Sequence, residues 1–335
     1  MKQLYLFLVI LLLTVTTNLY GQEQFQLTQF NNSAHAINPA FTGIEDRINA
    51  AVGFRKQWSG LNDSPLYYYA GMSGTINAFK TRYTRKPSLR LSVPRYFNKL
   101  DQEVGTYKHG VGFYVSGDHF GAFDQYSTYF SYAFIYNISK RHKLSFGASA
   151  NLDFQQFNRN EISLYSADQD QVYQSYLQDH RSRFEGHLNF GIALTGARLF
   201  AGYSLHQGIS LRSRISINAD IDPGNYHHLM AGYNLPISQD LVFQPSVYLR
   251  YNRVNPYSLN MMARIRYQEQ FWGGIGYRQD QSVAFLLGFS VQEEFRISYS
   301  YDFPTQGPGI YFQGSHEFTL GLSLYRDKIS GDFLW

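Results

Sequence analysis

The residues best suited to acid–base or nucleophilic chemistry stand together as Ser315-His316-Glu317. A serine hydroxyl, an imidazole and a carboxylate are the groups of a hydrolytic relay. The three lie in a stretch of alternating apolar and polar residues, where adjacent side chains point to opposite faces of a strand. They cannot form a relay by themselves, so we expect no catalytic residues and no enzyme. A Ser and a His on neighbouring strands at a lipid-facing surface stay open as an alternative.

Metal and cofactor sites have little support. His227 and His228 are neighbours and should point to opposite faces of a strand. Asp168 and Asp170 begin a stretch like a calcium loop, but its later ligands and its glycine are missing. The glycines of "WGGIGYR" (272–278) precede no helix, as a nucleotide site would require. We expect neither a metal nor a cofactor.

The composition differs from that of an ordinary globular domain. Charged residues make up only 16% of the 335 residues, against roughly 25% in a typical soluble chain, and aromatic residues make up 17%. The absence of cysteine excludes disulfides, thiolate metal sites and a lipid-bearing cysteine. The formal net charge of +4 gives no reason to expect a nucleic-acid partner.

The first residues have the features of an export signal. Lys2 gives a positive start, and the apolar core "LYLFLVILLL" is followed by a stretch that ends at the small residue Gly21. We expect residues 1–21 to be a signal peptide and residues 22–45 to be an N-terminal periplasmic segment. A membrane anchor helix is the alternative, but the apolar run is shorter than the ~20 residues that a span needs.

From about Arg47 onward, apolar and polar residues alternate with a period of two. In "KLSFGASANLDF" (143–154), for example, Leu, Phe and Ala fall on one face and Lys, Ser, Gly, Asn and Asp on the other. Many such stretches are about ten residues long, the length that lets a tilted strand cross a bilayer. Strands are expected near 46–57, 65–77, 110–117, 124–138, 142–157, 184–196, 198–206, 226–236, 240–252, 257–267, 269–279, 281–291, 293–302 and 315–326.

Short and long connections alternate between these strands. "SKRHK", "GAR", "ISQD", "QEQ" and "QEE" are short, whereas 158–183 and 207–224 are long. Barrels of the outer membrane place short turns in the periplasm and long loops outside. We therefore predict an all-β fold, a transmembrane antiparallel outer-membrane β-barrel of about 14 strands over 46–326. A soluble β-sandwich or β-helix is the alternative.

One connection and the C-terminus break the pattern. Residues 80–108 should form a short turn but are long, and eight Lys/Arg against two acidic residues give this basic insertion a net charge of +6. It is either a contact for anionic lipid, cell-wall polymer or an acidic protein, or a basic loop without a partner. Its candidate contact residues are Arg82, Arg85, Lys86 and Arg90. Residues 327–335 form a C-terminal tail.

The polar face of the strands carries several arginines, which a barrel would direct into its lumen. These candidate partner-binding residues are Arg250, Arg264, Arg266, Arg278 and Arg296. Two interpretations remain open. The arginines either receive an acidic segment of a cargo protein, or form inward ion pairs and hydrogen bonds that fill the lumen.

Residues 25–325 resemble the PorP/SprF family, outer-membrane proteins of the Bacteroidetes type IX secretion and gliding-motility system. The resemblance begins with "INPAFTG" (37–43) and continues through Arg55 and Trp58 to "WGGIGYR", "SYSYD" (298–302) and "GSHEFTLG" (314–321). The family-motif residues given a structural role are Asn38, Pro39, Gly43, Trp58, Trp272, Gly274 and Asp302.

The resemblance implies an accessory component of type IX secretion at the outer membrane and not an enzyme. Its implied partners are the C-terminal region of a secreted adhesin, periplasmic secretion-ring proteins or peptidoglycan-binding proteins, besides outer-membrane lipid. Such a barrel would hold or present the adhesin, or link it to the secretion and gliding machinery. A diffusion channel or small-molecule transporter is the alternative function, and a lipid-modifying enzyme is a third.

Overall fold

The structure is a computed structural model of the whole chain. The residues that it describes are 26–45, 47–61, 63–76, 104–158, 182–196, 198–212, 225–253, 257–291, 294–306, 308–311 and 313–324. Within this part of the chain, no helix is long and apolar enough to cross a membrane. The predicted signal peptide (1–21), most of the basic insertion and the tail 327–335 lie outside the described residues.

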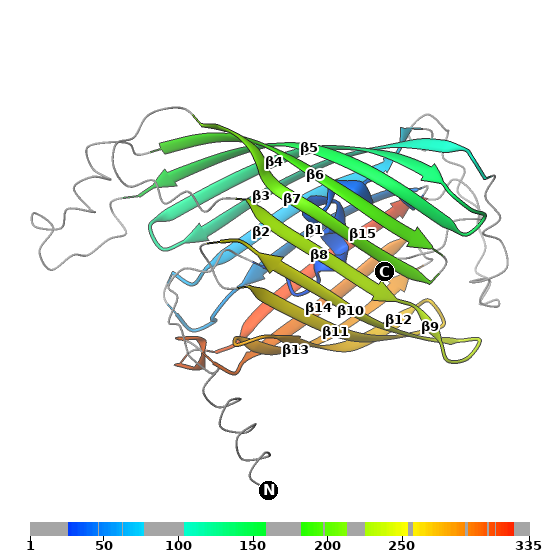
Figure 1. Cartoon of the computed structure of the whole chain (residues 1–335). Coiled ribbons are helices and arrows are strands. Elements are labelled where there is room, and N and C mark those ends of the chain that lie inside the picture. Colours follow the sequence, from blue (N-terminus) through cyan, green and yellow to red (C-terminus); the bar gives the residue numbers. More distant parts are fainter. Residues whose placement is uncertain are drawn as a thin grey trace, which may run out of the picture.

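The described chain forms a closed antiparallel β-barrel (Figure 1). Each strand pairs with its neighbours in sequence, and the first strand pairs with the last to close the ring. β8 and β9 both pair with β10 and count as one interrupted strand, so the barrel has 14 strands, as the sequence predicts. The strands are β1 (Ile48–Lys56), β2 (Leu66–Thr75), β3 (Tyr107–Phe120), β4 (Phe123–Asn137), β5 (His142–Phe157), β6 (Ser182–Gly196), β7 (Leu199–Arg212), β8 (Tyr226–Tyr233), β9 (Leu235–Pro236), β10 (Leu241–Tyr251), β11 (Ser258–Tyr267), β12 (Phe271–Arg278), β13 (Ser282–Val291), β14 (Phe295–Pro304) and β15 (Ser315–Leu324).

Two strands are longer than the sequence pattern predicts. β3 was expected over 110–117 and β7 over 198–206, but both continue for several more residues. The added ends carry polar residues such as Asp118, and β7 passes an irregularity near Gln207, whose φ is +58°. Alternation fails to mark the far ends because Gly117 and His119 in β3, and Gln207 in β7, interrupt the apolar face there. Lys108, assigned to the basic insertion, lies in β3.

The alternating residues separate into two faces as expected. Large apolar and aromatic side chains such as Phe130 and Leu287 point outward and are exposed on the barrel wall. Their polar neighbours, among them Ser145, Asn189 and Thr319, point inward and are buried. Only a surrounding lipid phase makes so large an exposed apolar surface stable, so the outer wall is the membrane-facing surface.

The barrel has two distinct ends. At the short-turn end, β1 begins, β15 ends, and the turns 138–141, 237–240 and 268–270 connect neighbouring strands. At the long-loop end lie the connections 57–65 and 305–314, the second of which contains a 3-10 turn, η4 (Pro308–Tyr311). The connection between β2 and β3, which includes most of the basic insertion, is the long exception at the short-turn end.

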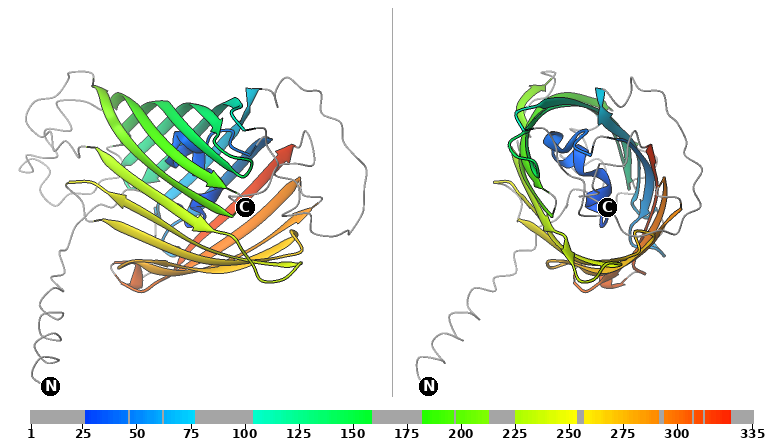
Figure 2. Two further views of the ribbon diagram at one scale, coloured as in Figure 1. Left: turned by 45° about the vertical axis from the view of Figure 1, so that its right-hand side comes forward. Right: turned by 90° about the vertical axis from the view of Figure 1, so that its right-hand side faces the viewer.

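The segment before the first strand lies inside the barrel. Residues 26–45, here called the plug, fold into η1 (Phe30–Ser33), α2 (Ala34–Ile37) and η2 (Pro39–Phe41). An end-on view shows these blue turns within the ring of strands (Figure 2). The expected periplasmic position of 22–45 thus differs from the structure, in which the described part of this segment occupies the lumen.

The plug supplies half of the apolar core of the protein. Its Phe30, Ala34, Ala40, Phe41 and Ile44 are almost fully buried. They pack against wall residues Ala193, Phe200, Met230, Tyr248, Met262 and Leu286. The rings of Phe41 and Phe200 meet edge to face, with centroids 6.3 Å apart. The apolar side chains of this wall therefore have the plug as their packing partner.

The Asn-Pro turn is the tightest contact between plug and wall. The Asn38 side chain accepts a hydrogen bond from the Ala40 N–H at 2.9 Å, and its Nδ2 donates to the carbonyls of Ile192 and Tyr203, both at 3.2 Å. Pro39 has the fixed φ that suits the first residue of η2.

Glycines in the wall make room for this turn. A Cβ at Gly147 would overlap the backbone of Pro39 and Ala40, and one at Gly191 would overlap the Asn38 side chain. Gly43 has a φ of +68°, and its Cα lies close to Gly110, so a side chain would be strained there and would clash. Residues 38–44 are called the anchor below.

The fit between anchor and wall can be tested with two glycines. Gly147→Ala should lower the free energy of unfolding by about 1–3 kcal/mol, because the new methyl group overlaps the anchor backbone. Gly276→Ala, at another inward position, is the matched control. Its Cβ would meet no atom closer than 3.4 Å, so we expect a change of no more than about 0.5 kcal/mol. Denaturant unfolding of both variants in detergent micelles measures the difference, and equal losses would contradict the docking.

Candidate functional site

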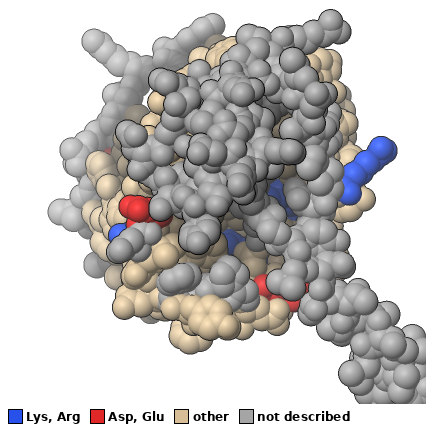
Figure 3. All heavy atoms as spheres, turned by 90° about the vertical axis from the view of Figure 1, so that its left-hand side faces the viewer, with Lys and Arg blue, Asp and Glu red and all other residues tan. Residues whose placement is uncertain are grey.

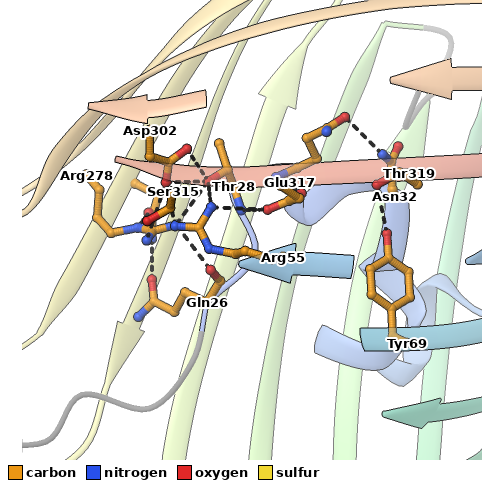
Figure 4. Close-up of polar contacts among 12 residues, drawn as sticks. Gln26, Thr28, Asn32, Arg55, Tyr69, Arg278, Asp302, Ser315, Glu317 and Thr319 are labelled. Atoms are coloured by element: carbon orange, nitrogen blue, oxygen red, sulfur yellow. Dashed lines mark hydrogen bonds and ion pairs between the residues drawn. The ribbon is translucent and has the colours of Figure 1, made fainter. Parts of the chain in front are cut away.

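The polar centre of the lumen lies where the plug begins. Five residues, here called the latch, meet at this place: Thr28 of the plug and Arg55, Arg278, Asp302 and Glu317 of the wall (Figure 4). Arg55 and Asp302 are near the long-loop ends of β1 and β14, and Glu317 is near the start of β15. The latch therefore belongs to the long-loop half of the lumen.

The Arg55 guanidinium is the hub of the latch. Its Nη2 lies 2.6 Å from Asp302 Oδ2, and its Nη1 lies 3.4 Å from Glu317 Oε2. Arg278 adds a second guanidinium, with Nη1 3.9 Å from Asp302 Oδ2. The side chains of Arg55, Asp302 and Glu317 are almost fully shielded from solvent. Two guanidinium groups and two carboxylates balance one another, which a buried cluster of charges requires.

The latch holds the plug mainly by its backbone. The N–H groups of Thr28 and Gln29 donate to the two oxygens of Glu317, at 2.7 and 3.0 Å. Arg278 Nη2 donates to the Gln26 carbonyl at 3.3 Å. The Thr28 hydroxyl lies 2.7 Å from Asp302 Oδ2 and accepts from Arg55 Nη1 at 2.8 Å. Charge-assisted hydrogen bonds such as these are about twice as strong as neutral ones.

Gln26 extends the contact along the wall to β10 and β11. Its side-chain amide lies within 2.8 Å of Asn260 Nδ2 and 3.0 Å of Ser258 Oγ. When the Gln26 side-chain amide is oriented with its oxygen toward Arg250, this oxygen accepts a hydrogen bond from Arg250 Nη2 at 2.7 Å. In this orientation the amide oxygen faces donors and the amide nitrogen faces an acceptor. The start of the plug is therefore held by β10, β11 and β12 on one side and by β1, β14 and β15 on the other.

The lumen arginines predicted from the sequence do not form one cluster. Arg250 and Arg278 contact the plug as described, and Arg264 donates to Gln244 on the neighbouring strand. Arg266 is buried in the wall. Arg296 lines a cavity of about 50 Å³ between the plug and the wall, near the short-turn end. The described occupant of this lumen is the protein's own plug, and whether a cargo segment also binds there stays a prediction.

The family-motif residues lie in four different places in the described structure. Asn38, Pro39 and Gly43 belong to the anchor, and Asp302 belongs to the latch. Trp58 has a φ of +53° in the loop after β1, and its N–H donates to Ser315 Oγ at 3.3 Å. Two more lie on β12: Trp272 packs against the apolar core, and Gly274 leaves room for the backbone of Ala263 and Arg264. The basic-insertion residues Arg82, Arg85, Lys86 and Arg90 lie outside the described residues.

Sequence reasoning missed the hub of the site. Arg55 was noted only as part of a motif, and Glu317 only as one polar residue of the lumen face. Barrel closure places Arg55 directly opposite Glu317 in the register of β1 and β15. The ion pair could have been predicted by pairing the first strand with the last, because an inward arginine opposite an inward carboxylate is an expected cross-strand pair.

The neighbouring residues first considered for catalysis or metal binding point to opposite faces of the barrel wall. His316 faces outward, where its Nδ1 lies 2.6 Å from the Tyr299 hydroxyl, while Glu317 faces the lumen. His227 and His228 likewise bond to tyrosines on opposite faces, Tyr203 and Tyr248. Among the described residues, no group of three or more His, Asp or Glu side chains could hold a metal ion.

One histidine belongs to the plug itself. His35 packs edge to face against Tyr114, with ring centroids 5.8 Å apart. Burial lowers the pKa of His35 to about 4, so its imidazole is neutral at neutral pH. The ring adds no charge to the plug under those conditions.

Comparison with protein families identifies the chain's relatives. The family model described as "Type IX secretion system membrane protein PorP/SprF" matches residues 19–322, nearly the whole chain. The chain belongs to the PorP/SprF family. This PorP/SprF protein is a β-barrel of the outer membrane, and both the latch and the anchor fall within the matched range. A comparison with curated proteins gives no match.

Solved structures similar to this PorP/SprF barrel are distant in sequence. The toluene transporter TbuX of Ralstonia pickettii is 10% identical with a TM-score of 0.49, over 88% of this chain and 94% of that one. The toluene transporter TodX of Pseudomonas putida is 11% identical with a TM-score of 0.44, over 87% and 92%. The translocator domain of autotransporter NalP from Neisseria meningitidis is 9% identical with a TM-score of 0.36, over 88% and 92%. At these identities the likeness is one of barrel fold alone.

Removing one latch carboxylate tests the charge balance of the PorP/SprF lumen. Asp302→Ala would leave Arg55 with Glu317 as its remaining latch carboxylate, and loss of one partner of a buried ion pair costs about 3–5 kcal/mol. Asp240→Ala, in the turn before β10, removes the same charge outside the lumen and should change the free energy of unfolding by less than about 0.5 kcal/mol. Denaturant unfolding of both variants in micelles measures this, and a similar small effect for the two would refute the assigned role of the latch.

Proposed function

We propose that this PorP/SprF barrel is an accessory component of type IX secretion that holds a secreted adhesin at the cell surface, or links it to the secretion and gliding machinery. Family membership supports a place in the secretion system. The holding role is an interpretation of the barrel's interior, whose described part is occupied by a segment of the same chain.

The observation that carries this proposal is the occupied lumen. The plug runs through the barrel from the latch, near the long-loop end, to Ile44, whose carbonyl accepts from Lys143 near the short-turn end at 2.8 Å. Buried apolar side chains of the plug fill the space between these points. Barrels of similar size conduct only when their lumen is open, and a plugged lumen is the other known arrangement.

The same observation weighs against the alternative of a diffusion channel. Of the two best-formed cavities within the described part of the lumen, the larger has a volume of about 50 Å³. A solute of the size of a sugar or an amino acid needs a continuous path and a far larger volume. A barrel that holds a protein partner requires no such path.

Isolation of the barrel from native outer membranes tests the proposal. An affinity-tagged protein should co-purify with a secreted adhesin or with secretion components, identified by mass spectrometry. An unrelated outer-membrane barrel with the same tag is the control for non-specific recovery.

Conductance in a planar lipid bilayer separates the two functions. We expect a silent barrel, because the plug closes the lumen. Steady conductance together with recovery of a solitary barrel would overturn the proposal and favour the channel.

A further inference from the structure

The latch recognises little of the plug's sequence. Three of its hydrogen bonds go to main-chain groups, namely the N–H groups of Thr28 and Gln29 and the carbonyl of Gln26. Main-chain groups carry no sequence information, so another segment that forms the same turn at residues 28–29 would present them in the same way. Side-chain recognition involves the Gln26 amide, the Thr28 hydroxyl and the Phe30 ring, whose centroid lies 5.4 Å from that of Tyr248. The wall therefore has the chemistry of a peptide-binding site.

The first half of the plug fits this site imperfectly. Gln29 Nε2 and Asn31 Oδ1 are buried and have no hydrogen-bond partner among the described residues. Asn31 and His35 also border the cavity of about 50 Å³. A buried polar atom without a partner costs about 1–3 kcal/mol. These residues weaken the binding of their own segment.

The polar groups of the anchor, by contrast, have hydrogen-bond partners on the wall. The Ala40 carbonyl accepts from Ser145 Oγ at 2.6 Å, the Thr42 hydroxyl lies 3.0 Å from that of Ser131, and the Ile44 carbonyl accepts from Lys143 Nζ. The wall glycines fit the anchor backbone closely. The buried polar atoms of the plug that lack a hydrogen-bond partner thus lie before the anchor and not within it.

The latch is also the contact between plug and wall that lies nearest to the long-loop end. Asp302 of the latch and the Ser258 contact of Gln26 lie near strand ends that adjoin the connections 305–314 and 252–257. In the view from this end, few of the described atoms in sight belong to Lys, Arg, Asp or Glu (Figure 3). Short turns are periplasmic in outer-membrane barrels, so this end faces the exterior.

We propose that the latch is a peptide-binding site in which residues 26–33 are an exchangeable occupant. The ligand that replaces them is an uncharged segment of an exported protein that can form the same turn, with a hydroxyl residue two positions before an aromatic one, entering from the long-loop end. The identity of this ligand as part of an adhesin rests on the proposed function, whereas the exchange itself does not.

The mechanism of exchange follows from the two halves of the plug. Residues 38–44 stay docked and keep the lumen closed at the short-turn end. Residues 26–33 leave the latch, and the incoming segment donates its N–H groups to Glu317 and its hydroxyl to Asp302. The charges of the latch remain paired throughout, because Arg55 contacts both carboxylates.

Cysteine labelling tests the exchange, since the chain contains no cysteine. Ser33→Cys and Thr42→Cys place one thiol in each half of the plug, at sites that are both nearly inaccessible. The probe is a synthetic peptide with the sequence of residues 25–33, FQLTQFNNS. Adding it to the full-length barrel in lipid nanodiscs should raise the rate at which the Ser33→Cys thiol reacts with a maleimide about tenfold or more, and leave the rate at the Thr42→Cys thiol unchanged.

Two controls separate a shared site from general loosening. The peptide with Thr28→Val and Phe30→Ala should have little effect on labelling. Thr28→Val in the barrel itself should strengthen binding of the unaltered peptide about tenfold, because the internal competitor loses the hydrogen bonds of its hydroxyl to charged groups.

The outcomes are distinct. Selective acceleration of labelling in the Ser33→Cys variant, together with tighter peptide binding by the Thr28→Val barrel, supports the exchange even if no adhesin co-purifies with the protein. Equal, slow labelling of both thiols at millimolar peptide overturns it, as does unchanged peptide affinity in the Thr28→Val barrel. In that case residues 26–33 are a permanent part of the lumen, while the proposed role in secretion would still stand.

Discussion

The contact of the buried Arg55 with Asp302 and Glu317 is the interaction on which the rest of the lumen depends. It joins β1, β14 and β15, the strands at which the barrel closes, and it binds the start of the plug. Burial of these charges is tolerable only because each has an opposite charge and further hydrogen bonds. The backbone of Thr28 and Gln29 supplies two of those bonds to Glu317. The plug and the charge cluster therefore stabilise each other.

Chain connectivity makes the arrangement possible. The plug ends just before β1 begins, so its last residues must lie near the short-turn end. Its first described residues reach the latch at the opposite half of the lumen. A segment of twenty residues with three short helical turns spans this distance and packs its apolar side chains on one wall. The lumen is thereby filled without a separate domain.

Much of the barrel could be predicted from the sequence because its two faces meet different solvents. Alternation is strong where one face contacts lipid and the other the lumen, as in β5 and β15, and it predicted those strands closely. It is lost toward the far ends of β3 and β7, where Gly117, His119 and Gln207 interrupt the apolar face. The period of two therefore reports the environment of the wall and not the full length of each strand.

The site was harder to predict because it depends on contacts between distant parts of the chain. Residues 26–45 show no regular period, and their helical turns have only three or four residues each. No pattern in "FQLTQFNNSAHAINPAFTG" indicates that this segment packs against glycines of β5, β6 and β7. Of the two interpretations of the lumen arginines, the structure shows contacts within the chain, since Arg250 and Arg278 contact the plug, and binding of an acidic cargo segment stays a prediction.

Hydrogen–deuterium exchange of the barrel in lipid nanodiscs tests the central claim, that the N-terminal segment is folded inside the lumen. The amides of Asn38, Phe41 and Thr42 donate within the plug, so peptides covering 38–44 should be protected to a degree close to that of the strands. Peptides covering 26–33 should exchange faster than these but slower than an unstructured peptide of the same sequence. Complete exchange of both regions at the rate of an unstructured chain would contradict the account.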